Sequence, residues 1–170
     1  MNATATRSPQ PTTHTRAFDA ARHGRLEELQ DMLGSGFPVN EANDKGNSLL
    51  MLAAYHGHAE AVELLLQHGA DPDQRNTRGQ TPLGGVAFKG HLRVARILLQ
   101  AGADPRAEQG CGRLPITFAA VSGHPAVVNL LRHAAGEPEE DRRGLTWLAR
   151  LIGQTRRLFV PRLYRGAMVA

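Results

Sequence analysis

The chain has 170 residues, of which 41% are hydrophobic and 21% charged, and its formal net charge at pH 7 is +4. These values are typical of a soluble globular protein that is long enough to bury a core. A membrane-spanning helix needs about 18 consecutive apolar residues, and the sequence has no such run. Cys111 is the single cysteine, which excludes an internal disulfide and favours a reducing, cytoplasmic setting.

Residues 1–15 are rich in Thr, Pro, Ser and Ala, a composition that predicts a disordered N-terminal tail. The stretch has no apolar segment of the secretory type, so we expect no signal peptide. Arginine provides all but two of the 20 basic residues, which is typical of a GC-rich, bacterial genome.

The sequence then repeats itself with a period of 33 residues. Apolar residues recur with this period, and so do four glycines, Gly24, Gly57, Gly90 and Gly123. We predict four units, at about 11–43, 44–76, 77–109 and 110–136. One such unit cannot bury its apolar side alone, so the repeat predicts a stack in which each unit covers the next.

Each unit predicts two short helices, as the third shows. Thr81 is expected to cap a helix that starts at Pro82 and ends at Gly90. A second helix is expected from about 92 to 100, followed by Gly102 in a left-handed conformation.

Residues 78–105, RGQTPLGGVAFKGHLRVARILLQAGADP, resemble an ankyrin repeat in their T-P-L, G-H and G-A-D elements. The resemblance covers about residues 17–136. It implies an all-α ankyrin-repeat solenoid of helix–turn–helix units joined by turn or hairpin tips. The sequence departs from the family pattern where T-P-L-H has its His, because Met51, Gly84 and Thr117 stand there.

Two glycines, Gly84 and Gly85, lie inside the first predicted helix of the third unit. Each costs about 1 kcal/mol relative to Ala in a helix interior. We therefore expect this unit to be locally weak and Gly84→Ala to stabilise it, unless a bulky neighbour needs the space.

Residues 137–170 comprise a charged linker, EPEEDRR, and a basic amphipathic segment with seven Arg and no acidic residue from Arg142 on. Three interpretations stay open. Residues 144–160 can form a degenerate fifth unit that caps the stack, a segment that docks on a partner or an anionic surface, or a frayed tail. Residues 17–136 are nearly balanced in charge, so the repeats themselves show no basic footprint for nucleic acid.

The sequence offers little for catalysis or metal binding. His58, His91 and His124 recur at equivalent places in stacked units, where helix spacings of about 8–10 Å are too wide for a shared zinc ion. A turn role for these His is favoured. No phosphate-binding or nucleophile motif is present, and Cys111 lacks a nearby base. We expect a non-enzyme without cofactor or metal.

The resemblance implies a protein–protein interaction module, an adaptor or regulator that binds a partner protein through the concave face of the stack. In the family, contacts come from the turn tips and from exposed positions of each first helix. The matching residues are Asp44, Lys45, Asn47, Thr77, Arg78, Gln80, Cys111 and Arg113 at the tips, and Tyr55, His56, Phe88, Lys89, Val121 and Ser122 on the helices.

The aromatic pair Tyr55 and Phe88 is expected to face solvent and to anchor the partner. The other interpretation is that both rings fold onto neighbouring helices and serve packing. A different function is also open, in which the Arg-rich C-terminal segment binds an anionic membrane or nucleic acid and the repeats are a scaffold.

Overall fold

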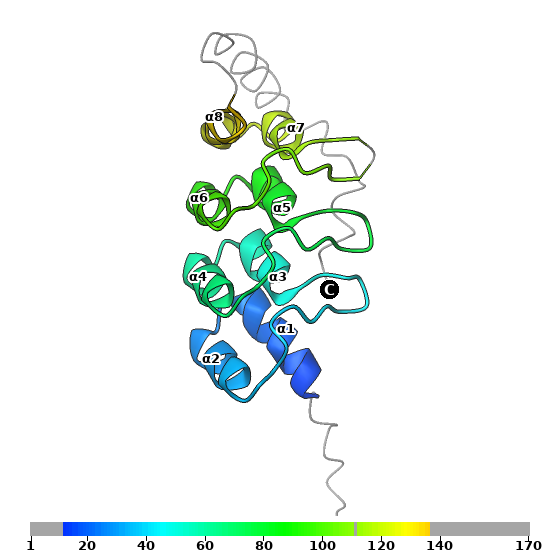
Figure 1. Cartoon of the computed structure of the whole chain (residues 1–170), viewed down its shortest axis with the longest axis vertical. Helices are drawn as coiled ribbons and strands as arrows, with labels where there is room; N and C mark the ends of the chain where they lie inside the picture. The colour runs from blue at the N-terminus through cyan, green and yellow to red at the C-terminus, as the bar shows by residue number, and fades with distance from the viewer. Residues whose placement is uncertain (1–11, 111, 137–170) are drawn as a thin grey trace, which may run out of the picture.

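The computed structural model describes residues 12–110 and 112–136, and these form two layers of helices in a single stack (Figure 1). The described helices are α1 (Thr13–His23), α2 (Leu26–Gly34), α3 (Leu49–His56), α4 (Ala59–Gln67), α5 (Pro82–Lys89), α6 (Leu92–Gln100), α7 (Pro115–Val121) and α8 (Pro125–Ala134). Inner helices α1, α3, α5 and α7 pack on one another in that order, and outer helices α2, α4, α6 and α8 do the same. This confirms the all-α solenoid.

The helix ends follow the sequence signals closely in the third unit. The Thr81 side chain accepts a hydrogen bond from the Gly84 N–H, and Pro82 occupies the first turn, where no amide hydrogen is needed. Gly90 ends α5 with a φ of 81°. The second helix spans Leu92–Gln100, as predicted, and Gly102 follows it with a φ of 92°.

The predicted N-terminal tail is too long by three residues. Helix α1 begins at Thr13, and the Thr12 hydroxyl accepts a hydrogen bond from the Thr15 N–H at 3.3 Å. The buried side chains of Ala17 and Phe18, one turn later, anchor the helix in the core, which the polar composition of residues 1–15 does not indicate. Residues 1–11, Cys111 and residues 137–170 lie outside the described part, and so do the predictions made for them.

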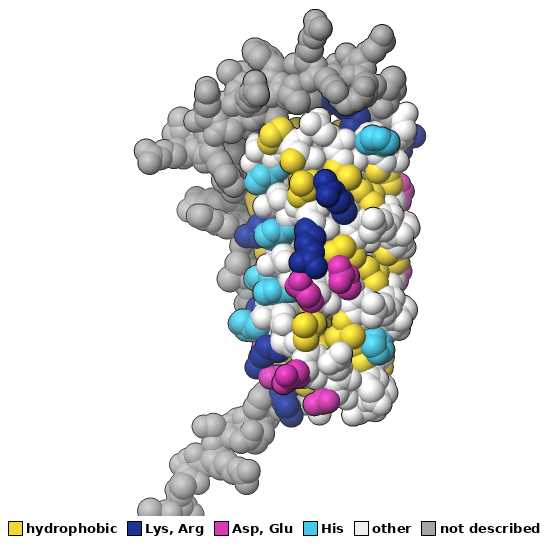
Figure 2. All heavy atoms as spheres, turned by 90° about the vertical axis from the view of Figure 1, so that its left-hand side faces the viewer, with side chains coloured by type: hydrophobic (Ala, Val, Ile, Leu, Met, Phe, Trp, Pro, Cys, Tyr) yellow, Lys and Arg dark blue, Asp and Glu magenta, His cyan; other side chains and the backbone are white. Residues whose placement is uncertain are grey.

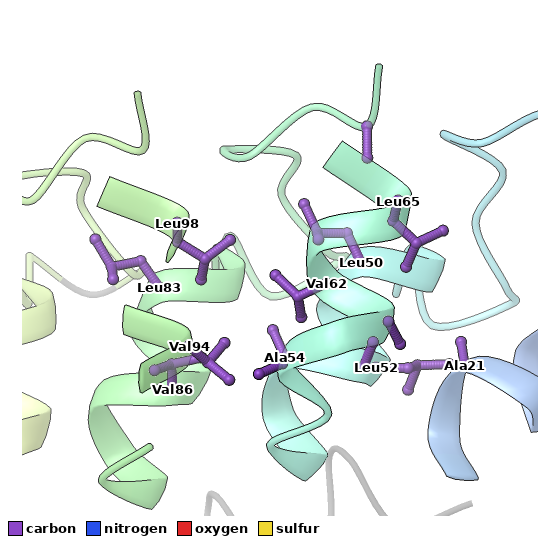
Figure 3. Close-up of a cluster of buried hydrophobic side chains, with 14 of the residues drawn as sticks. Ala21, Leu50, Leu52, Ala54, Val62, Leu65, Leu83, Val86, Val94 and Leu98 are labelled. Carbon is purple, nitrogen blue, oxygen red and sulfur yellow. The ribbon is translucent and has the colours of Figure 1, made fainter. Parts of the chain in front are cut away.

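Aliphatic side chains form the core between units. Figure 3 shows Leu50 and Val62 of one unit, and Leu83 and Val94 of the next, among the side chains that fill the space between their helices. Each of these four is at most 1% exposed. Burying a side chain of this size contributes about 1.5–3 kcal/mol, so the interfaces between units stabilise the stack.

The exception stated for Gly84 applies, because a neighbouring side chain occupies the space beside it. A Cβ atom at this position would overlap the carboxamide of Gln109, whose Cγ lies 3.1 Å away. The Gln109 Nε2–H donates to the Thr81 hydroxyl, and its Oε1 accepts from the Thr81 N–H, both at 2.8 Å. Gly84 therefore makes room for the Gln109 side chain, from the end of the same unit, which holds the start of α5 through Thr81.

Candidate interaction face

The tips of the stack expose some of the predicted contact residues and bury others. Asp44, Thr77, Arg78 and Arg113 are exposed, and Lys45 is half-buried. Asn47 is 1% exposed and Gln80 is 6% exposed, so the prediction that these two offer their side chains to a partner is wrong.

The reason for this burial is a hydrogen-bond network around Asn76. Its Nδ2 donates to Asn47 Oδ1 and to Gln80 Oε1, each at 3.0 Å. Its Oδ1 accepts from the backbone N–H groups of Arg78 and Gln80. Thr77 links neighbouring tips, because its hydroxyl donates to the Lys45 carbonyl at 2.9 Å. The tips are thus a linked structural row in which polar groups satisfy one another.

The prediction that Tyr55 faces solvent is wrong. Its side chain is 5% exposed and belongs to a second cluster with Met51, against which Phe88 and Phe118 pack. We call these four residues the inner cluster. Burial raises the pKa of the Tyr55 phenol above its ordinary value. The ring therefore packs onto neighbouring helices, which is the alternative that the sequence left open.

Other predicted residues of the inner helices remain accessible. His56 and Lys89 are exposed, Phe88 and Ser122 are half-buried, and Val121 is 41% exposed. Val121 occupies in α7 the position that Phe88 has in α5, and Lys89 that of His56 in α3. The accessible positions therefore recur from unit to unit on one face.

The recurring His residues stabilise the turns between units. The Nε2 atoms of His58, His91 and His124 lie 2.9, 3.1 and 3.1 Å from carbonyl oxygens of the preceding unit, those of Arg22, Tyr55 and Phe88. Because a carbonyl only accepts, each Nε2 carries the donated hydrogen. These bonds support the structural role that the spacing favoured.

A run of aromatic and cationic side chains lies beside the accessible positions. The Lys89 ammonium is 4.8 Å from the centroid of the Tyr55 ring, and the His56 ring meets Tyr55 edge-on at 5.4 Å. The His58 ring stacks on His56 at 6.3 Å. The sequence does not indicate His58 as part of this face, because its recurrence at the period of the repeat favours a role in the turn alone.

In the described part of the chain, neither a metal site nor a hollow lies at the predicted contact residues. The described residues contain no group of three or more His, Cys, Asp and Glu placed to hold a metal ion. Two hollows, of about 360 and 340 Å³, lie between α1 and α2 and between α6 and α8, and neither is lined by a predicted contact residue. None of the described helices is long and apolar enough to cross a bilayer.

Comparison with known proteins agrees with the geometry of the stack. A family model described as ankyrin repeats, in three copies, matches residues 17–109. A Pseudomonas aeruginosa protein described as an ankyrin repeat protein is 53% identical over 36 residues. That match covers 21% of this chain and 21% of the relative, so the chain spans about a fifth of the length of the relative it matches.

Proposed function

The chain belongs to the ankyrin-repeat family, and from this premise we propose that it is a non-catalytic adaptor or regulator that binds a partner protein through its concave face. Ankyrin repeats generally mediate protein–protein interaction, and stacked repeats present extended binding surfaces. The observation that carries the proposal is the recurrence of accessible side chains at matching positions of successive inner helices. Phe88 and Val121 form one such column, and His56, Lys89 and Ser122 form the other.

A large apolar side chain beside charged ones is the composition of interface hot spots. Phe88 is half-buried against Met51 and Tyr55, so its ring is held in place before a partner arrives. A contact that is already ordered loses little conformational entropy on binding. Arg78 and Arg113 at the tips stand at the rim, where charges mainly raise the rate of association.

Site-specific photo-crosslinking in the native cell tests this proposal. A photoreactive residue at Val121 should capture a protein partner, because this position is exposed on the inner face. The matched control carries the same residue at Gln100, which is exposed on outer helix α6. Equal capture of the same protein at both positions, or none at Val121, would contradict binding through the concave face.

The second candidate function assigns binding to the Arg-rich C-terminal segment, with seven Arg and no acidic residue from Arg142 on. Deletion of residues 137–170 then abolishes binding to an anionic membrane or nucleic acid, and affinity falls steeply with salt before deletion. Binding through the concave face survives the same deletion. A cytoplasmic location is part of the main proposal, because the lone Cys111 suits a reducing compartment.

A further inference from the structure

Cationic and titratable side chains gather where inner helices α1, α3 and α5 end. We call the following residues the cationic cluster: Arg22, His23, His56, His58 and Lys89. The positive charges of the other four residues disfavour protonation of the His56 imidazole. Figure 2 shows a column of His side chains along one edge of the stack, with basic side chains beside it.

The cluster is held in place by contacts within the stack. His58 is fixed through its hydrogen bond to the Arg22 carbonyl at 2.9 Å, and its ring stacks on His56. Lys89 reaches back from α5 over the Tyr55 ring of α3. Because Tyr55 is 5% exposed, the ammonium and the imidazole next to it lie on a rigid aromatic base.

Two carboxylates lie beside the cluster, and each has an arginine partner. Asp19 accepts a hydrogen bond at 2.9 Å from Arg22, so it offsets that one charge of the cluster, and Glu60 accepts one at 2.6 Å from Arg93, which lies outside the cluster. Burial lowers the pKa of His56, and the positive charges of His58, Arg22, Lys89 and His23 lower it further. Protonation of His56 is therefore opposed by an electrostatic potential that a bound anionic group would reverse.

We propose that the partner presents an acidic segment, whose carboxylates bind the cationic cluster while an apolar side chain of the segment packs on Phe88 and Val121. This inference rests on the proposed function and names the chemistry of the partner. The apolar column and the cluster meet at the end of α5, where Lys89 follows Phe88 directly in the chain. An acidic, partly apolar segment is the class of peptide that matches both features.

The inference implies that acidification strengthens binding. The charged groups that act on His56 are Arg22 and His23 on α1, Lys89 on α5, and His58 at the start of α4. Asp19 pairs with Arg22, and Glu60 and His91 lie near His58. The pKa of His56 lies below its ordinary value of about 6.5, so its protonation adds positive charge to the cluster only as pH falls through that lowered pKa, while carboxylates of the partner, with a pKa near 4, stay ionised.

The experiment uses a synthetic peptide rich in Glu and Leu, and a control peptide in which every Glu is replaced by Gln. Binding to the full chain is measured by fluorescence anisotropy at low salt. The acidic peptide should bind at least about tenfold more tightly than the control, and the double variant Lys89→Gln with His56→Gln should lose about tenfold for the acidic peptide alone. Arg96→Gln, on the outer helix α6, should bind as the unaltered chain does.

The outcomes separate this inference from the proposed function. Equal binding of the two peptides overturns the acidic preference and leaves binding of a protein through the concave face untouched. An equal loss in the Arg96→Gln variant, or no binding of the acidic peptide, overturns the cluster as its site. The crosslinking at Val121 decides the proposed function independently. Because His56 and Lys89 are exposed, circular dichroism should show that the double variant folds normally.

Discussion

At the scale of single residues, several glycines make room for a polar side chain of the next unit. Gly57 has a φ of 83°, and a Cβ atom there would lie 2.9 Å from Cε1 of the His91 ring. The G-H element of the repeat therefore joins two units, since the glycine of one accommodates the histidine of the following one. Gly84 makes room for Gln109 within a single unit, and no left-handed backbone is involved there.

The substitution Gly84→Ala should lower stability, because the added methyl group displaces Gln109 from its hydrogen bonds to Thr81. We expect a loss of about 1–3 kcal/mol in the free energy of unfolding. Urea unfolding measures the change. Gly34→Ala is the matched control, since Gly34 is helical with no atom within 4 Å of its Cβ position, and it should stabilise by up to about 1 kcal/mol. A higher urea midpoint for Gly84→Ala would mean that Gln109 moves aside freely.

Tyr55→Ala should destabilise the fold rather than test binding. Truncation of a buried aromatic side chain costs about 3–5 kcal/mol, because it removes apolar contacts and leaves a cavity. The loss should appear as a lower melting temperature by circular dichroism. Val121→Ala, at a position that is 41% exposed, should change stability by no more than about 0.5 kcal/mol. A Tyr55→Ala variant that melts with the unaltered chain would show that the ring does not stabilise the inner cluster.

At the scale of the elements, helix pairs are joined by turns that histidines hold. His91 lies between α5 and α6 and donates to the Tyr55 carbonyl at the end of α3. Burial lowers the pKa of His91, and the nearby charges of Lys89 and His58 lower it further, against the opposing effect of the hydrogen bond. The neutral ring is thus the form that the stack favours.

Because of His91 in this turn, we predict that the stability of the fold falls on acidification. With a folded pKa below the unfolded value of about 6.5, the unfolded chain binds more protons in this range. The stability from neutral His91 is present above about pH 6.5 and is lost as pH falls through the folded pKa. In His91→Gln, whose amide can still donate, the urea midpoint should fall less between about pH 7.5 and 5.5. An identical fall in both proteins would exclude His91 as a source of the effect.

At the scale of the whole molecule, the outer helices carry a charge gradient along the stack. Helix α2 carries Glu27 and Glu28 in its first turn, whereas α6 carries Arg93 and Arg96, and Figure 2 shows basic side chains above the acidic ones in the middle of this face. Glu27 on α2 and Glu60 on α4 share one column with Arg93 on α6. Arg93 bridges back to Glu60 at 2.6 Å and to Glu63 at 3.7 Å, so part of the gradient links adjacent units. These bridges are exposed, and such pairs contribute little to stability.

The last described helix of the stack, α8, carries a buried arginine. Arg132 takes the place in α8 that Leu33, Leu66 and Leu99 hold in the other outer helices, and it is 4% exposed although it lies in the last described unit. If residues 144–160 close the stack, truncation after Gly136 should uncover this end and lower the melting temperature. Melting by circular dichroism, with size-exclusion chromatography for aggregation, tests this. An unchanged melt and clean monomeric elution would favour a free tail.

The sequence alone determined the period, the helix pairs and the family, because Gly, Pro and Thr at fixed spacing act through local backbone geometry. Tertiary structure alone decided which predicted contact residues are accessible. Tyr55 and Phe88 hold the same place in their units, yet Tyr55 is buried because its neighbours are Met51, Phe88 and Phe118. Asn47 and Gln80 turn inward because Asn76 donates hydrogen bonds to the amide oxygens of both. Gly84 is a requirement rather than a weakness for the same reason: a side chain 25 residues away in sequence occupies its space. Burial at these positions depends on which side chains pack against them in the folded stack, and the repeat pattern does not specify that.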